Sequence, residues 1–229
     1  MRLSGREDTE EFFFEATFIS LFTQSKFLIP DTKGTYNWGF EQCNNLWNEY
    51  IAIMEGRKKE KYNLGRMVFW RNENGEKVVF DGHQRIVTMY LLFRAIYKKF
   101  EVLSPVDLED FTERQQIDIT RLSFEISSMI WVLDFITQKI INKNKILITI
   151  NNDDNKEIFY SIMEKGFSLG ENNYSNNYRF FVEKCNSLTI LDLVEFCITL
   201  FGTKVLPVEC DTLESANTYI RLENNVICS

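Results

Sequence analysis

The residues best suited to chemistry form one short run, Asp81-Gly82-His83-Gln84-Arg85, which holds the only histidine of the sequence. The run follows an apolar stretch typical of a strand and precedes a pattern typical of an amphipathic helix. Unpaired N–H groups at a helix start attract anions, and the helix dipole adds to the attraction. Gly82 lets a phosphate approach the backbone, and Arg85 offers a planar fork of donors. We therefore expect a phosphate site here.

The carboxylate of Asp81 sets a condition on that site, because it repels phosphate unless a cation lies between them. Mg²⁺ bound by one carboxylate and by phosphate oxygens meets the condition. We expect Asp81 to hold Mg²⁺ with a nucleoside triphosphate (NTP), and Gln84 or His83 to place a water or act as a base. A plainer alternative stays open, in which Asp81 is a helix cap, Gly82 a turn, and Arg85 and His83 solvated residues.

Hydrophobic spacing and turn residues predict the elements that position this run. They are a helix or helix–strand entry over 9–24, a loop over 27–38, a helix over 39–55, strands over 62–70 and 77–80 joined at Asn74-Gly75, a helix over 84–100, helical structure from about 105 to 143, a short strand over 146–150, a helix over 153–165, a polar loop over 172–177, helices over 178–187 and 191–201, a strand over 205–209 and a helix over 213–223. The late strand is expected to rejoin the first sheet.

The domain organisation follows from this order. The chain has 229 residues, 45% of them hydrophobic, which is enough for one sizeable core. We expect a single α+β domain over 1–229, with an αβ core of about 1–100 and 203–229 and a helical insertion of about 104–202.

A few further residues are candidates for the site. Lys33 and Gly34 lie in a predicted loop and could face a phosphate, although a plain surface loop is the alternative. Tyr36 and Trp38 could stack on a base or belong to the core. Asn224, near the end of the last predicted helix, could be a polar site contact or a helix cap.

Composition excludes several classes of protein. The net charge of −7 argues against a general DNA binder, whose affinity comes from cationic side chains. The five cysteines include no C-x-x-C pair, so neither a zinc knuckle nor a disulfide framework is indicated. There is no G-x-x-x-x-G-K-[ST] loop, so the sequence is not that of a P-loop NTPase. The N-terminus does not resemble a signal peptide and no apolar run could span a bilayer, so we expect a cytoplasmic protein without membrane partners.

One family shares these features. The run from Asp81 to Thr88 resembles the D-G-Q-Q-R-L-T-T motif of the ParB/sulfiredoxin-like domain at the N-terminus of GmrSD-type, modification-dependent restriction enzymes. Ile29-Pro30 with Tyr36 and Trp38 is similar to its I-P-x-Y-Q-R-x-Y-x-W segment, and Leu64-Gly65 to its L-G strand. Ala216 and Asn224 keep the spacing of its A-x-x-I-F-x-x-x-N helix. The likeness covers most of the chain.

The resemblance implies a ParB-like mixed sheet core with large helical insertions, and nucleotide hydrolysis coupled to DNA restriction or nicking. Asp81, Gly82, Gln84 and Arg85 match the motif residue by residue. His83 replaces the first Gln of the motif, and Lys33-Gly34 replace its Q-R. We expect no H-N-H nuclease domain in this sequence, because one histidine cannot build it.

Three functions follow as hypotheses. The first is an NTP-binding domain of a restriction or phage-defence system, in which hydrolysis is an open question and DNA is reached through a partner nuclease subunit. The second is a catalytically degenerate binding or regulatory subunit of such a system. The third is a metal-dependent DNA nickase, for which the sequence offers one carboxylate, Asp81, where nuclease sites gather several.

Overall fold

The central element of the computed structural model is a mixed sheet of five strands. The structure describes residues 18–59, 61–134, 140–142, 145–149, 156–168 and 170–227. The strand order is β6-β1-β3-β2-β7, and among these strands the β2–β3 pair alone is antiparallel. The strands are β1 (Phe27–Ile29), β2 (Asn63–Arg71), β3 (Lys77–Asp81), β6 (Ile146–Ile148) and β7 (Lys204–Cys210).

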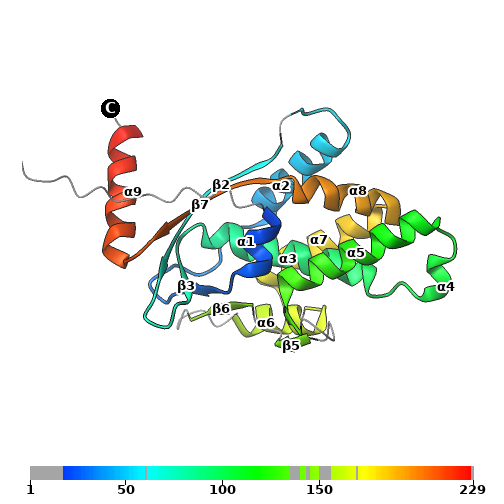
Figure 1. Cartoon of the computed structure of the whole chain (residues 1–229), viewed down its shortest axis with the longest axis horizontal. Helices are drawn as coiled ribbons and strands as arrows, with labels where there is room; N and C mark the ends of the chain where they lie inside the picture. The colour runs from blue at the N-terminus through cyan, green and yellow to red at the C-terminus, as the bar shows by residue number, and fades with distance from the viewer. Residues whose placement is uncertain are drawn as a thin grey trace, which may run out of the picture.

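Most of the helices lie together beside this sheet (Figure 1). They are α1 (Phe18–Gln24), α2 (Phe40–Met54), α3 (His83–Phe100), α4 (Pro105–Leu108), α5 (Glu113–Ile130), α6 (Lys156–Lys165), α7 (Asn173–Ser187) and α8 (Ile190–Phe201). The last helix, α9 (Leu213–Ile227), stands apart at the opposite end of the molecule. Within the described residues, no helix has the length and apolar character needed to cross a membrane.

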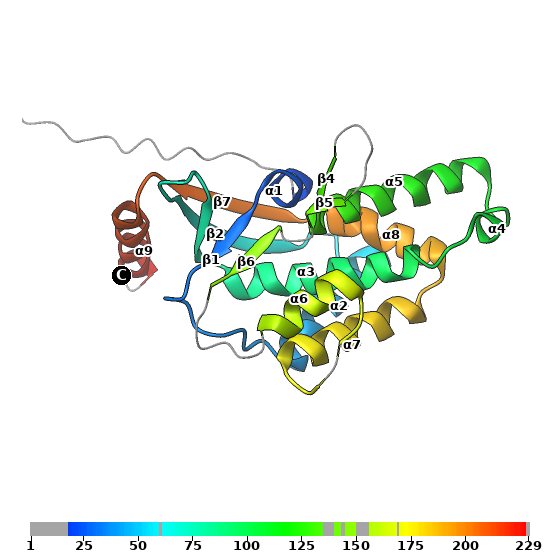
Figure 2. The ribbon, with the colours of Figure 1, turned by 90° about the horizontal axis from the view of Figure 1, so that it is seen from below.

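Helix α3 is the centre of the main core. It continues directly from the sheet and runs between α5 and α7 (Figure 2). The sequence predicts one apolar face for this helix, but the structure buries twelve of its eighteen residues, on nearly every side. A helix surrounded in this way is rigid, so its first turn is a firm platform for a site.

Alternation along the strands separates two cores. Met67 and Phe69 of β2 face the main core, while Val68 faces the other side of the sheet. There Val68 packs with Val208 of β7 and Ala216 of α9 in a small second cluster. Helix α9 therefore covers the face of the sheet that α3 does not.

The structure confirms the predicted elements around the site. The strand–turn–strand–helix order from β2 to α3 is as expected, and Gly75 in the hairpin turn has a φ of 74°. The late strand does rejoin the first sheet, where β7 pairs in parallel with β2. The α+β class with helical insertions is confirmed. In the helix expected over 9–24, Phe18 and Phe22 are fully buried, and the residues before Phe18 lie outside the described part of the chain.

Three local predictions are wrong. The loop expected over 27–38 begins with the strand β1, which is too short for a periodic signal. The helical structure expected to about 143 ends at Ile130, where the extended backbone of Trp131 leads into a small hairpin of β4 (Val132–Leu133) and β5 (Ile140–Asn142). The polar loop expected over 172–177 is the start of α7, capped by Asn172. In addition, β6 lies inside the predicted helical insertion and joins the main sheet.

Candidate phosphate site at the start of helix α3

Gly82 forms the junction between β3 and α3. Its φ of 96° lies in the left-handed region, which favours glycine. A Cβ at this position would lie 3.0 Å from Cγ of Met67 and 3.3 Å from Nη2 of Arg85. The first helical bond runs from the Ile86 N–H to the Gly82 carbonyl, and among the described residues no side chain caps the helix. Asp81 is therefore not a helix cap, and the first-turn N–H groups have no partner within the helix.

The guanidinium of Arg85 is held between the ends of two strands. Its Nη1 donates to the Leu64 carbonyl at 2.8 Å and its Nη2 to Oδ2 of Asp81 at 3.0 Å. The side chain is 23% exposed, so it is not the solvated residue of the plainer alternative. Gly65 makes room for it, because a Cβ there would lie 2.7 Å from Nη1. The guanidinium is thus held in place by the protein itself, before any ligand arrives.

Lys33 brings a second cation to the same place. A backbone bond from its N–H to the Pro30 carbonyl closes the turn after β1, and its ammonium lies 4.3 Å from the ring centroid of Phe80. Burial lowers the pKa of Lys33, and the charge of Asp81 offsets part of that shift. With Arg85 and Lys33 against the half-exposed Asp81, the three charged groups carry a net positive charge.

The side-chain amide of Gln84 is saturated by four hydrogen bonds, three of them to backbone groups. Its Nε2 donates to the Thr35 carbonyl at 3.0 Å, and its Oε1 accepts from the N–H groups of Asn37 at 3.0 Å and Trp38 at 3.3 Å. The second hydrogen on Nε2 points to Nε2 of His83 at 3.0 Å. A side-chain amide has two donor hydrogens and two acceptor lone pairs, so all four positions are used. The contacts are those of a residue that fixes the loop beside the helix.

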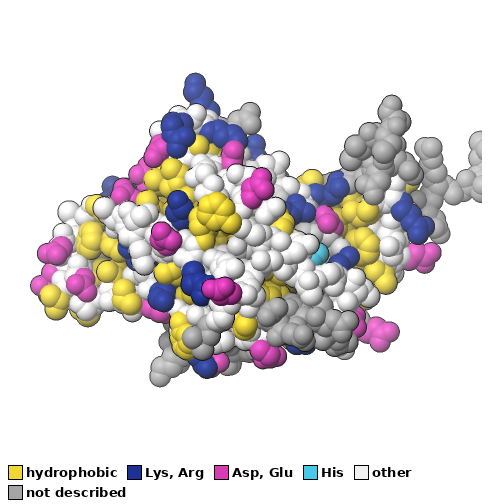
Figure 3. All heavy atoms as spheres, turned by 180° about the vertical axis from the view of Figure 1, so that it is seen from behind, with side chains coloured by type: hydrophobic (Ala, Val, Ile, Leu, Met, Phe, Trp, Pro, Cys, Tyr) yellow, Lys and Arg dark blue, Asp and Glu magenta, His cyan; other side chains and the backbone are white. Residues whose placement is uncertain are grey.

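The same contacts define the state of His83. Because Gln84 Nε2 can only donate, Nε2 of His83 must accept, and the ring proton belongs on Nδ1. Nδ1 is then left to donate to the backbone of Gly34, with which the ring forms a hydrogen bond. Burial, and next the charge of Lys33, lower the pKa of His83 below its ordinary 6.5. His83 is therefore neutral at pH 7. Figure 3 shows the histidine at the surface beside basic side chains.

The residues predicted from the sequence are largely brought together. The run from Asp81 to Arg85 and the pair Lys33-Gly34 meet at the start of α3. Tyr36 is buried beneath them, where it cannot stack on a base.

Asn224 is not brought to the site. It lies in α9, the helix that covers the other face of the sheet, and its side chain is outside the described part. No sequence pattern singles out Asn177 of α7, whose side-chain amide donates to the Tyr36 hydroxyl and to the Trp38 carbonyl.

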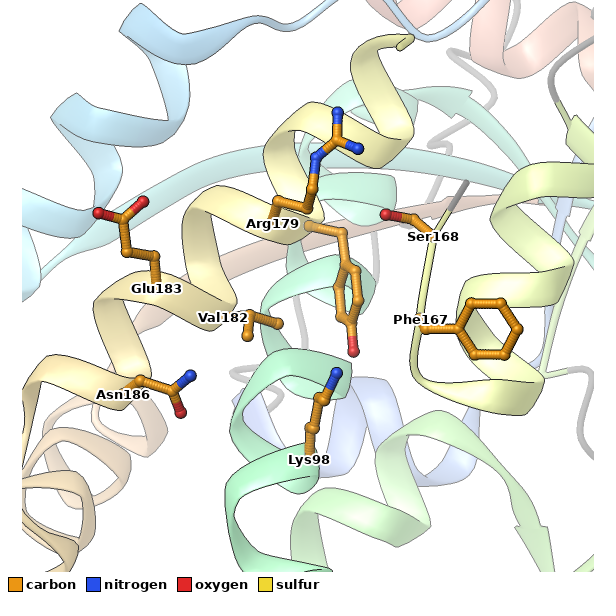
Figure 4. A pocket seen from close by; sticks show the side chains of 8 residues that line it. Lys98, Phe167, Ser168, Arg179, Val182, Glu183 and Asn186 are labelled. Carbon is orange, nitrogen blue, oxygen red and sulfur yellow. The ribbon is translucent and has the colours of Figure 1, made fainter. Parts of the chain in front are cut away.

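Two other observations concern metal binding and the position of the hollows in the protein. Among the residues that the structure describes, no three His, Cys, Asp or Glu side chains are placed to bind a metal together. A hollow of about 430 Å³ lies away from the site, between α3, residues 167–168 and α7 (Figure 4). The side chains that line it include Tyr178 and Val182 and the two basic residues Lys98 and Arg179.

Comparison with known proteins identifies the family of the chain. The family model described as the GmrSD restriction endonuclease, N-terminal domain, matches residues 18–225, nearly the whole chain. None of the curated proteins compared with the chain matches it. The matched range includes the sheet, the helical insertion and every residue of the candidate site that the structure describes. The chain therefore belongs to the family of the GmrSD restriction endonuclease N-terminal domain.

Proposed function

We propose that this chain is the nucleotide-binding component of a restriction or phage-defence system, and that it binds the phosphates of an NTP at the start of α3. The observation that carries the proposal is the uncapped first turn of an eighteen-residue helix, flanked by the prearranged guanidinium of Arg85 and the ammonium of Lys33. Helix N–H groups, a fixed fork and a nearby ammonium are the donors that polyphosphates favour.

Mg²⁺ fits this site as part of the nucleotide. Oδ2 of Asp81 is engaged by Arg85, and the half-exposed carboxylate retains further acceptor positions for a cation. Mg²⁺ takes one or two protein carboxylates and completes its shell with phosphate oxygens and waters. A single carboxylate therefore suits a metal that arrives with an NTP. A nickase site needs more ligands than Asp81, and no such group is present among the described residues.

The contacts favour binding over hydrolysis. For Gln84 to place an attacking water, it would have to give up a bond to the loop, because its amide is saturated. His83 shares one of those bonds through its accepting nitrogen. We therefore infer a binding or regulatory subunit whose bound nucleotide controls a partner nuclease that acts on DNA. Hydrolysis by this chain is the second candidate, and it would appear as phosphate release that is lost in Asp81→Ala.

Calorimetric titration with Mg·ATP, Mg·GTP and Mg·CTP tests the proposal. Wild-type protein should bind at least one of the three. Arg85→Ala should weaken that binding at least tenfold, because a charge-assisted hydrogen bond contributes about 1.5–3 kcal/mol. Arg71→Ala is the matched control, since Arg71 also pairs with a carboxylate, Glu209, but at the far end of β2. Equal affinity in Arg85→Ala and wild type would reject the assignment.

A further inference from the structure

The segment 33–38, here called the Lys33 loop, is anchored through a buried hydroxyl. Tyr36 is 5% exposed, and its OH lies 2.7 Å from Oγ1 of Thr88 in α3. The same OH receives a hydrogen bond from Nδ2 of Asn177 in α7 at 2.8 Å. Since the phenol accepts from Asn177, its own hydrogen can go to Thr88. Two helices therefore meet the loop at one atom.

Asn177 holds the loop at a second point. Its Nδ2 also donates to the Trp38 carbonyl at 2.8 Å. Asn177 is buried, with 1% of its surface exposed. One turn earlier in α7, Asn173 donates to the Tyr36 carbonyl at 3.4 Å and the ring of Tyr174 stacks on Tyr36 at 4.9 Å. Helix α7 thus binds the Lys33 loop on one side, and Gln84 of α3 binds its backbone on another.

Buried polar contacts of this kind fix a geometry more sharply than apolar packing does. Each donor must meet its acceptor within a few tenths of an ångström, and a buried group left unpaired is costly. Tyr36 follows Lys33 by three residues, so the place of its hydroxyl limits where the ammonium can lie. The backbone of Gly34, which bonds His83, belongs to the same loop.

We propose that α7 is a working part of the nucleotide site, with Asn177 and Tyr36 as positioning residues that hold Lys33 against the phosphates. The inference rests on the proposed function. Asn177 touches no ligand in this arrangement, and its effect on binding passes through the Lys33 loop. The predicted helical insertion, from which α7 comes, is then a component of the site. A contact on α7 could change nucleotide affinity.

The test uses Asn177→Leu, which nearly keeps the volume and removes both donors. Tyr178→Phe is the control, because it deletes a buried hydrogen bond of 2.7 Å to the Gly166 carbonyl from the adjacent residue of the same helix. Amide hydrogen exchange at Asn37 and Trp38 should be at least tenfold faster in Asn177→Leu and unchanged in Tyr178→Phe. If Asn177→Leu does not fold, Tyr36→Phe replaces it with the same expectation.

A double-mutant cycle separates positioning from general destabilisation. Asn177→Leu should weaken Mg·NTP binding at least fivefold in the wild-type background and have no effect in a Lys33→Ala background. Equal losses in both backgrounds, or unchanged exchange at Asn37 and Trp38, would overturn the inference. If wild-type protein binds no NTP, the proposed function fails, and the exchange experiment still decides whether α7 holds the loop.

Discussion

A pair of glycine substitutions isolates the role of the Arg85 guanidinium. Gly65 and Gly75 have nearly the same backbone, with φ of 79° and 74°. Alanine at either position adopts a left-handed conformation, at a cost of about 1–2 kcal/mol. The surroundings differ. A Cβ on Gly75 has no atom within 4 Å, whereas a Cβ on Gly65 lies 2.7 Å from Nη1 of Arg85.

The size of the effect follows from that distance. To reach an ordinary contact of 3.4 Å from 2.7 Å, the guanidinium must move by about 0.7 Å. Because Arg85 is held by two hydrogen bonds, we expect this movement to cost it the 2.8 Å bond to the Leu64 carbonyl. Loss of a charged hydrogen bond adds about 1.5–3 kcal/mol, reduced by the partial exposure of the group. Gly65→Ala should therefore lower the free energy of unfolding by about 2–4 kcal/mol, and Gly75→Ala by about 1–2 kcal/mol.

Two assays on this pair give the decisive comparison. Urea denaturation measures the two stabilities, and calorimetric titration with Mg·NTP measures the two affinities. Displacing the fork should weaken nucleotide binding about tenfold in Gly65→Ala, which corresponds to about 1.4 kcal/mol, and leave Gly75→Ala at the wild-type affinity. If both variants bind as tightly as wild type while Gly65→Ala shows the larger loss of stability, the guanidinium has moved without consequence, and Arg85 does not hold the nucleotide.

Two further predictions concern titration and burial. Because the pKa of His83 is lowered in the folded state, the unfolded chain binds a proton more tightly, so the free energy of unfolding should decrease as the pH falls below about 6.5. His83→Gln should remove that component of the pH dependence in denaturation curves, and an unchanged slope would count against the neutral state of His83. Lys145 is buried, and its ammonium donates to the carbonyls of Phe22, Thr23 and Ser128, which ties the end of α1 to the end of α5. Lys145→Met should lower the free energy of unfolding by at least about 2 kcal/mol, and a midpoint of urea unfolding within error of wild type would contradict this bonding.

The sequence predicts the core of the site because the signals there are local. Asn74-Gly75 marks the hairpin, Asp81-Gly82 ends the strand, and the apolar spacing after His83 is that of a long helix. These neighbours place Asp81 and Arg85 together without knowledge of the rest of the fold. Lys33 could be proposed as a site residue but not placed, because its position depends on β1 pairing with β3.

The roles of individual side chains depend on distant segments, which the sequence does not reveal. Gln84 is suited by type to place a water, yet its amide is taken by backbone groups of the Lys33 loop, more than forty residues away in the chain. Asn177 lies in a stretch that is rich in Asn, and Asn is a poor helix former, which favours a loop prediction. Burial of Tyr174, Asn177 and Tyr178 against the loop and α3 outweighs that preference. No local pattern distinguishes such an Asn from a solvated one.

Nucleotide binding at the start of α3 is tested most directly by the change in backbone amide chemical shifts when Mg·NTP is added to the isotopically labelled protein. Binding at the start of α3 should give the largest changes at the amides of His83, Gln84 and Arg85, followed by those of Lys33 and Gly34. Binding at the start of α3 is ruled out if no amide shifts, or if the largest changes occur elsewhere, for example around Tyr178 and Val182 in the hollow beside α7.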